Sequence, residues 1–255
     1  MTAQQTHPSS SKLSGLTDRD RQLVADITRF GQLEAKQAQR LHFAEEKSSK
    51  ESREVRAWRT LKRLADRKVV SRIERTLGGG GGGSTGYVYQ APTSRADGIN
   101  YHKLDIAELY VRLVELERRE PERMKLVRYR PELYTHRRPA KGQPKPDARI
   151  EVEVAGALKR WQLELDRGTE WPYQIRTKLK QYVRAWENWE EDFFPPVLFV
   201  VGRKLTVDER ERKELLQEQI DRLPEADREP FGVVVFDEAV EWLVPSDPGS
   251  AKASG

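Results

Sequence analysis

The stretch that decides the fold of the second half of this chain is Asp147-Ala148-Arg149-Ile150-Glu151-Val152-Glu153-Val154, followed shortly by Trp161-Gln162-Leu163-Glu164-Leu165-Asp166. Polar and apolar residues alternate through both segments. Because successive side chains of a strand point to opposite faces, each segment is predicted to be a strand with one polar face. The short connection between them predicts an antiparallel hairpin.

Two registers of this hairpin are open. A four-residue turn over 155–158 places Asp147 opposite Asp166, whereas a two-residue turn at Ala155-Gly156 places it opposite Glu164. Either register gathers the acids on one face. Carboxylates placed side by side repel one another unless a cation lies between them. The cluster is therefore either a divalent-metal site or the solvent-exposed face of a hairpin on which the acids form ion pairs with arginines.

Helices and strands alternate around the predicted hairpin. Residues 172–191 are predicted to form a helix, because Pro172 suits a first helical turn and apolar residues recur at helical spacing after it. The short apolar runs 196–201 and 231–236 are typical of buried strands. The remaining predicted elements are helices over 104–117 and 207–222 and a strand over 125–129. The predicted fold class is α/β, of the α+β kind, with a mixed sheet.

This element order, together with its acids, resembles the PD-(D/E)xK nuclease-like fold. Pro146-Asp147 matches the first half of the motif and Glu164 matches its second acid. Asp166 stands where the motif has lysine, and this departure bears on catalysis rather than on the fold. Some members of the superfamily take the lysine from the following helix, where Lys178 is the candidate.

The chain also resembles a narrower group, the replication-relaxation family. The resemblance rests on several short segments in order and extends from about residue 15 to 200. The segments are Leu16 to Asp20, Phe30-Gly31, Gln39 to Phe43, Pro146 to Ala148, Glu164 to Glu170, and Lys178-Leu179 with Tyr182. The resemblance implies a DNA-binding protein linked to plasmid or mobile-element replication and relaxation. It also implies plasmid replication or transfer proteins as partners.

A metal at the acidic cluster is expected to be Mg²⁺ or Mn²⁺, because oxygen donors without histidine or cysteine suit these ions. The candidate metal ligands are Asp147, Glu164, Asp166 and Glu170. The candidate catalytic residues are Asp147, Glu164, Asp166 and Lys178, with Lys178 offsetting the negative charge that develops on a phosphate. The expected reaction is metal-dependent nicking or cleavage of DNA.

The positive charge of the chain is concentrated in its first third. Residues 1–92 hold 17 Lys and Arg against 10 Asp and Glu, a net charge of +7, whereas the remainder carries −2 of the total +5. A lopsided basic segment suits a polyanionic partner, since each neutralised phosphate releases condensed counterions. The expected partner is double-stranded DNA.

Three helices are predicted in this basic segment. Thr17 caps the first, which Gly31 ends; the second covers about 34–43 and the third about 48–68. On the third helix, Trp58 is predicted to share the apolar side with Ala57 and Leu61, opposite a face of arginines and hydroxyls. Such a face suits a helix lying in a major groove. The candidate DNA-binding residues are Arg53, Arg56, Arg59, Arg63, Arg67, Ser49, Ser52, Thr60 and Arg72. The plainer alternative is a solvated basic face.

A second hairpin is predicted after these helices, formed by 69–77 and 84–90 with the six glycines Gly78 to Gly83 at its tip. Three helices followed by two strands predict a winged helix-turn-helix. Ser84-Thr85 lacks the preceding lysine of a phosphate-binding P-loop, so a nucleotide site is excluded.

Shifts in composition predict two domains between two tails. The winged helix covers 15–92 and the nuclease-like domain 99–245, with disordered tails over 1–14 and 246–255. Arg137, Arg138, Lys141 and Lys145 form a predicted basic loop beside the acids. That loop is equally compatible with DNA-backbone contact and with a solvated linker.

The composition also indicates where the protein is located in the cell and how it assembles. No apolar run approaches the ~20 residues of a membrane span, and the absence of cysteine favours a cytoplasmic protein without membrane contact. A homodimer is compatible with the sequence. The alternative function is a non-catalytic winged-helix protein, either a replication accessory or a transcription regulator, in which a degenerate nuclease-like domain is a scaffold.

Overall fold

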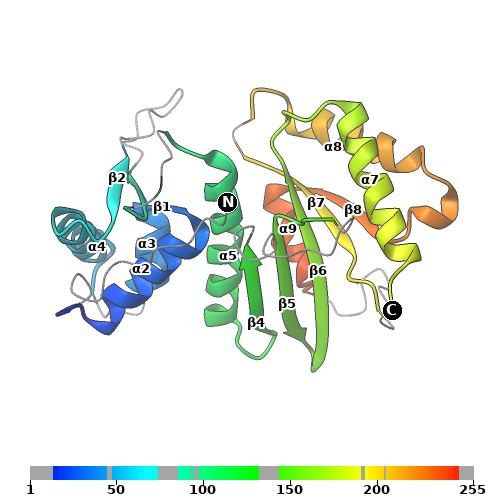
Figure 1. Cartoon of the computed structure of the whole chain (residues 1–255). Coiled ribbons are helices and arrows are strands. Elements are labelled where there is room, and N and C mark those ends of the chain that lie inside the picture. Colours follow the sequence, from blue (N-terminus) through cyan, green and yellow to red (C-terminus); the bar gives the residue numbers. More distant parts are fainter. Residues whose placement is uncertain are drawn as a thin grey trace. The chain divides into compact units, whose positions relative to one another are not determined.

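A computed structural model describes residues 14–44, 48–73, 86–92, 94, 98–131, 144–190, 193–203 and 205–246. It has the expected α+β composition, and the chain divides into two compact units, Met1–Val111 and Arg112–Gly255 (Figure 1). The division falls within helix α5 (Tyr101–Arg119). The glycine run, residues 1–13 and 247–255 of the predicted tails, and Arg137, Arg138 and Lys141 lie outside the described residues.

The first unit contains the three predicted helices and a small antiparallel sheet. Its elements are α2 (Asp18–Phe30), β1 (Gln32–Glu34), α3 (Ala35–His42), α4 (Lys50–Asp66), β2 (Ser71–Ile73) and β3 (Val88–Gln90). The strands lie in the order β1-β3-β2, so the predicted hairpin of β2 and β3 is confirmed. Strand β1, between the first two helices, was not predicted because three residues are too few to show an alternation.

The ends of these helices follow from local capping. The side chain of Thr17 accepts a hydrogen bond from the backbone N–H of Asp20 at 3.2 Å, and the Asp20 carboxylate accepts one from the backbone of Thr17 at 3.0 Å. This reciprocal arrangement satisfies two N–H groups that the helix leaves without partners. Gly31 ends α2 with a φ of 77°. Ser49 caps α4 by accepting from Ser52 N at 3.2 Å.

The second unit is built on a five-stranded sheet in the order β4-β5-β6-β7-β8 (Figure 1). Its strands are β4 (Met124–Pro131), β5 (Ala148–Val154), β6 (Ala157–Asp166), β7 (Val197–Val201) and β8 (Phe231–Val235). Its further helices are α7 (Pro172–Glu187), α8 (Glu209–Asp221), α9 (Ala239–Leu243) and the 3-10 turns η1 (Glu225–Asp227) and η2 (Phe236–Glu238). Strands β4 to β6 are antiparallel, and β6 to β8 are parallel, so the predicted mixed sheet is confirmed.

The β5–β6 hairpin has the two-residue turn, and the four-residue alternative was wrong. Ile150 lies opposite Trp161 and Ala148 opposite Leu163. The turn residues Ala155 and Gly156 both have positive φ, 50° and 78°, which matches the right-handed twist of the flanking strands. Continuing the register by one residue brings Asp147 opposite Glu164 rather than Asp166.

One face of the sheet is covered by α7 and α8. Their apolar residues, including Ile175, Leu179 and Leu216, form a core with Val197, Phe199 and Val201 of β7. By the parallel register, Glu164 and Asp166 of β6 lie on this same face, and both are buried. The expectation of a wet hairpin face was therefore wrong at this end of β6, because the parallel crossovers place helices over it. Within the described ranges, none of the helices is both long and apolar enough to span a bilayer.

Candidate active site and nucleic-acid interface

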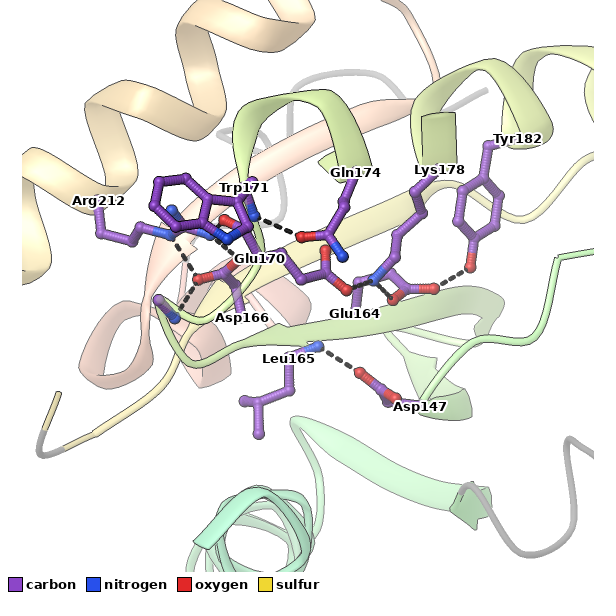
Figure 2. A network of polar contacts seen from close by, with 11 residues as sticks. Asp147, Glu164, Leu165, Asp166, Glu170, Trp171, Gln174, Lys178, Tyr182 and Arg212 are labelled. Atoms are coloured by element: carbon purple, nitrogen blue, oxygen red, sulfur yellow. Dashed lines mark hydrogen bonds and ion pairs between the residues drawn. The ribbon is translucent and has the colours of Figure 1, made fainter. Parts of the chain in front are cut away.

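Asp147 lies directly before β5, beside the C-terminal part of β6. Its backbone N–H donates to Leu163 O at 2.8 Å, and its Oδ2 accepts from the backbone N–H of Leu165 at 2.8 Å (Figure 2). The two bonds flank Glu164 and fix the Asp147 carboxylate at that level of the sheet. The structure thus brings these two predicted site residues together.

Glu164 is the most deeply enclosed carboxylate of this cluster. Its Oε2 lies 2.9 Å from Lys178 Nζ, and its Oε1 accepts a 2.5 Å hydrogen bond from the Tyr182 hydroxyl (Figure 2). Burial raises the pKa of Glu164 to about 7, and the negative charge of Asp147 adds to the shift. The Lys178 ammonium and the Tyr182 hydroxyl act in the opposite direction and lower the pKa of Glu164. Glu164 is therefore a carboxyl group whose charge is finely balanced near neutral pH.

Lys178 on the second turn of α7 joins two acids. Its Nζ contacts Glu164 and Glu170, each at 2.9 Å. Burial by itself lowers the pKa of Lys178, but the two carboxylates outweigh it and raise the pKa above its ordinary value. Burial and the neighbouring Glu164 raise the pKa of Tyr182 well above its ordinary value too. Lys178 is thus held as an ammonium and Tyr182 as a neutral phenol.

Asp166, two residues beyond Glu164, has different partners. Its two oxygens accept from Nε and Nη2 of Arg212, both at 2.7 Å, and Oδ1 also accepts from the backbone of Gly168 at 2.7 Å. Both side chains of this ion pair are buried. A bidentate guanidinium pair is among the strongest polar contacts in proteins. The structure therefore places Asp166 in a fixed ion pair rather than beside Asp147.

The Asp166–Arg212 pair also organises the loop between β6 and α7. Arg212 Nη2 donates to the carbonyl of Glu170 at 2.9 Å, and the backbone N–H of Trp171 donates to Gln174 Oε1 at 2.7 Å (Figure 2). Gly168 has a φ of 74°, and a Cβ there would meet Val207 Cγ2 at 3.0 Å. Both features favour glycine at this position.

The donor set fits a two-carboxylate metal site. No group of three or more histidine, cysteine, aspartate or glutamate residues able to hold a metal occurs in the described parts of the chain. Asp147 and Glu164 are close enough for the charge of one to raise the pKa of the other, a repulsion that a cation relieves. Asp166 and Glu170 instead contact Arg212 and Lys178. Asp147 and Glu164 are thus the pair suited to a hard cation.

Two residues of this network were not predicted as site residues from the sequence, although Tyr182 was among those that carry the family resemblance. Tyr182 is part of the apolar stripe of α7, and nothing in that periodicity indicates that its hydroxyl reaches a carboxylate. Arg212 lies 46 residues after Asp166 and was one of many charges on a polar helix. Only the tertiary pairing of α8 with the end of β6 brings it into the site.

The predicted DNA-facing arginines of α4 are mostly exposed. Arg56, Arg59, Arg63 and Arg67 are exposed, and Arg53 is half-buried. Three of the five make contacts within the first unit: Arg53 donates to Ala44 O at 2.9 Å, Arg63 pairs with Asp20 at 2.7 Å, and Arg67 donates to Ser14 O at 2.8 Å. The outward charge of α4 is therefore carried by four arginines.

The remaining candidates lie around this helix. Ser49 and Ser52 form its capping turn, Thr60 is half-buried, and Arg72 of β2 stacks over the Tyr87 ring at 4.4 Å. Trp58 is 47% exposed, so its predicted place on the buried side was wrong. The apolar side is formed by Ala57, Leu61 and Leu64, and Trp58 lies too far round the helix to join them.

These features define an α+β protein with a buried carboxylate–ammonium cluster on a mixed sheet and an arginine-bearing helix in a separate unit. Residues 91–197 match the family model described as replication-relaxation, which confirms the family resemblance over this segment. The match covers β4 to β6, α7 and every residue of the carboxylate cluster except Arg212, and supports a role related to replication or relaxation. The comparisons with curated proteins and with solved structures gave no match.

Proposed function

We propose that this chain is a DNA-binding protein of plasmid or mobile-element replication and relaxation whose second unit is a metal-dependent deoxyribonuclease. The observation that carries the proposal is the β5–β6 register, which places Asp147 beside Glu164 with Lys178 bonded to the latter. Two acids and a lysine at these places are the elements of a PD-(D/E)xK site.

The first unit supports duplex binding. The order α2-β1-α3-α4-β2-β3 with the sheet order β1-β3-β2 corresponds to a winged helix-turn-helix, in which α4 is the recognition helix. Arg56 and Arg59 project from the outer side of α4, where they suit guanine edges or phosphates. Arg72, beside Tyr87, suits a phosphate contact at the base of the wing.

The second unit supports a nuclease-like assignment. Helix α5, strands β4, β5 and β6, helix α7 and strand β7 follow one another in the order expected for that fold. Asp147 and Glu164 would hold Mg²⁺ or Mn²⁺. Such an ion supplies an activated water and stabilises the leaving oxygen of a phosphodiester.

Lys178 suits the role of a fixed positive charge. The raised pKa of Lys178 keeps it protonated at neutral pH, so it is a poor general base. Its ammonium is shared between Glu164 and Glu170, and from there it can stabilise negative charge on a phosphate oxygen. The lysine missing from the position of Asp166 is thereby supplied from α7.

A plasmid-nicking assay tests this function. Supercoiled plasmid is incubated with the full chain and Mg²⁺ or Mn²⁺, and conversion to the nicked circle is measured for wild type, Asp147→Ala and Glu164→Ala. Both variants are expected to lose nicking, whereas Glu153→Ala, an exposed acid on the same strand, keeps it. Equal nicking by all proteins would contradict the site.

A second candidate function is a non-catalytic DNA-binding protein with a nuclease-like scaffold. It is favoured by the contacts of Glu164, whose two oxygens already bond to Lys178 and Tyr182. Thermal melting with Mn²⁺ separates the two candidates, because an ion that binds only the folded state raises the melting temperature. If the nuclease-like unit is only a scaffold, Mn²⁺ should not raise the melting temperature of wild type, and neither metal should support nicking.

A further inference from the structure

Two aromatic side chains stand exposed at the start of α7. Trp171 is 68% exposed and Tyr173 is 60% exposed, the highest values for large hydrophobic side chains in the described part of the chain. Most aromatic rings of a folded protein are at least half covered, so neighbouring exposed rings point to a binding surface. Trp171 directly follows Glu170, which bonds to Lys178 of the candidate active site, and Tyr173 comes two residues after Trp171.

The backbone beneath Trp171 is held in place before any ligand arrives. Gln174 accepts from the Trp171 N–H, and Arg212 holds the preceding carbonyl while it pairs with Asp166 (Figure 2). Tyr173 lies in the first turn of α7, and its carbonyl accepts from the Thr177 hydroxyl at 2.9 Å. A pre-ordered surface loses little conformational entropy on binding.

Basic residues continue this surface along α7. Tyr173, Thr177, Lys180 and Arg184 are spaced four, three and four residues apart, so they follow one side of the helix, and all four are exposed. Lys180 and Arg184 therefore lie about two and three turns after Tyr173 on the same outward side of α7, and Trp171 stands at the N-cap before its first turn. Aromatic rings followed by cations fit a ligand that alternates flat apolar groups with negative charges.

We propose that Trp171, Tyr173, Lys180 and Arg184, the α7 platform, bind single-stranded DNA. Its unpaired bases stack on the two rings, and its phosphates contact Lys180 and Arg184. Duplex DNA is a poorer fit, because its base faces are covered by their stacked neighbours. The proposal rests on the proposed role in DNA processing and names the substrate of the second unit as a strand with unpaired bases.

Fluorescence anisotropy with the full chain tests the platform. A labelled oligothymidylate of about 20 nucleotides is the single-stranded probe, and a mixed-sequence duplex is the second probe. The double variant Trp171→Ala, Tyr173→Ala is expected to bind the single strand at least tenfold more weakly, since stacking contributes about 1–3 kcal/mol per base. Its affinity for the duplex, which depends on α4, is expected to change less than twofold.

Two further variants separate stacking from folding. Trp171→Phe with Tyr173→Phe keeps two flat rings and is expected to retain most of the single-strand affinity. Tyr101→Ala, which removes an exposed tyrosine from α5, serves as the matched control and is expected to leave that affinity unchanged. A loss in the phenylalanine variant as large as in the alanine variant would contradict stacking.

Salt dependence tests the basic part of the platform. Removing two phosphate contacts with Lys180→Ala and Arg184→Ala is expected to reduce the slope of log affinity against log salt by about 1.4 for the single strand. An unchanged slope would mean that these cations do not contact the strand.

The α7 platform would be overturned if wild type did not bind the single strand, or if the double alanine variant bound it as tightly as wild type. It would also be overturned if the two rings mediated self-association of the chain instead. The last is detected by sedimentation of wild type and variant. Failure of the proposed function is seen separately, as duplex affinity that Arg56→Ala with Arg59→Ala leaves unchanged, or as no metal-dependent nicking. Each hypothesis therefore has its own readout.

Discussion

Glu164 and Asp166 are two carboxylates on one strand, on one face and two residues apart, yet their surroundings differ. Asp166 is held by both nitrogens of a buried guanidinium and by a backbone N–H. Glu164 is held by an ammonium that it shares with Glu170, and by a neutral phenol. By the register of the hairpin, Asp147 lies opposite Glu164 and not opposite Asp166.

We interpret this difference as one between a structural carboxylate and a carboxylate of the proposed active site. A bidentate buried pair fixes its partners and leaves little capacity for another ligand. The ionised form of a carboxylate with a pKa of about 7, beside a second carboxylate, is stabilised when a cation binds between them. Asp166 therefore positions the loop before α7, whereas Glu164 belongs to the active site that we propose.

The largest effect is expected from Arg212→Ala. It leaves Asp166 buried without its cation and should lower the free energy of unfolding by about 3–5 kcal/mol, measured by urea denaturation. Arg210→Ala, an exposed arginine on the same helix, should change it by less than about 0.5 kcal/mol. Similar small effects in both variants would show that the Asp166 pair is not structural.

The next effect is a pH dependence carried by Glu164, which faces Asp147, Lys178 and Tyr182. Its pKa in the folded state, about 7, exceeds the ordinary 4.5, so the folded state binds more protons between these values. This contribution to stability is complete below pH 4.5 and is lost as the pH rises to about 7, on the order of 3 kcal/mol in total. Denaturation at several pH values measures it.

Glu164→Gln supplies the comparison for this pH effect, because an amide does not titrate. The stability of wild type relative to Glu164→Gln should fall as the pH rises through this window. Glu153→Gln, which changes an exposed acid of β5, should follow the wild-type curve. Parallel curves for wild type and Glu164→Gln would contradict the raised pKa of Glu164.

A smaller effect is expected from Gly168→Ala in the loop that Asp166 organises. The positive φ and the 3.0 Å approach to Val207 Cγ2 should lower the free energy of unfolding by about 1–2 kcal/mol. Gly156→Ala has a similar φ but no atom within 4 Å, so the difference between the two variants isolates the contact with Val207. Equal losses would show that this contact is unimportant.

The smallest effect is expected from Tyr182→Phe. The ring keeps its packing in the core while the hydrogen bond to Glu164 is lost, at a cost of about 1 kcal/mol in thermal denaturation. The pKa of Glu164 should rise further, because Tyr182 lowers it in wild type. A stability at pH 8 above that of wild type would contradict this role of Tyr182.

Local pattern predicted most elements of both units, with β1 and α9 as exceptions, while long-range pairing decided the site. The alternation in residues 147–154 and 161–166 was enough to predict β5 and β6, but not their register, because Ala155 is not a residue that typically adopts positive φ. Lys178 was a candidate catalytic residue because of its place on α7, and the structure brings it into contact with Glu164.

The different contacts of Glu164 and Asp166 could not be predicted from local pattern. Both residues occupy alternate positions of one strand, and local sequence gives them equal status. Arg212 distinguishes them only through the packing of α8 against the sheet. On α4, likewise, the periodicity predicted the helix but not that Asp20 takes Arg63 or that Trp58 faces outward.

Isothermal titration of the full chain with Mn²⁺ tests the central claim most directly. The account predicts that wild type and Tyr182→Phe bind one ion or a closely spaced pair, and that Asp147→Asn and Glu164→Gln lose this binding while they remain folded. Binding that persists in both of these variants, or no binding by wild type, would contradict it.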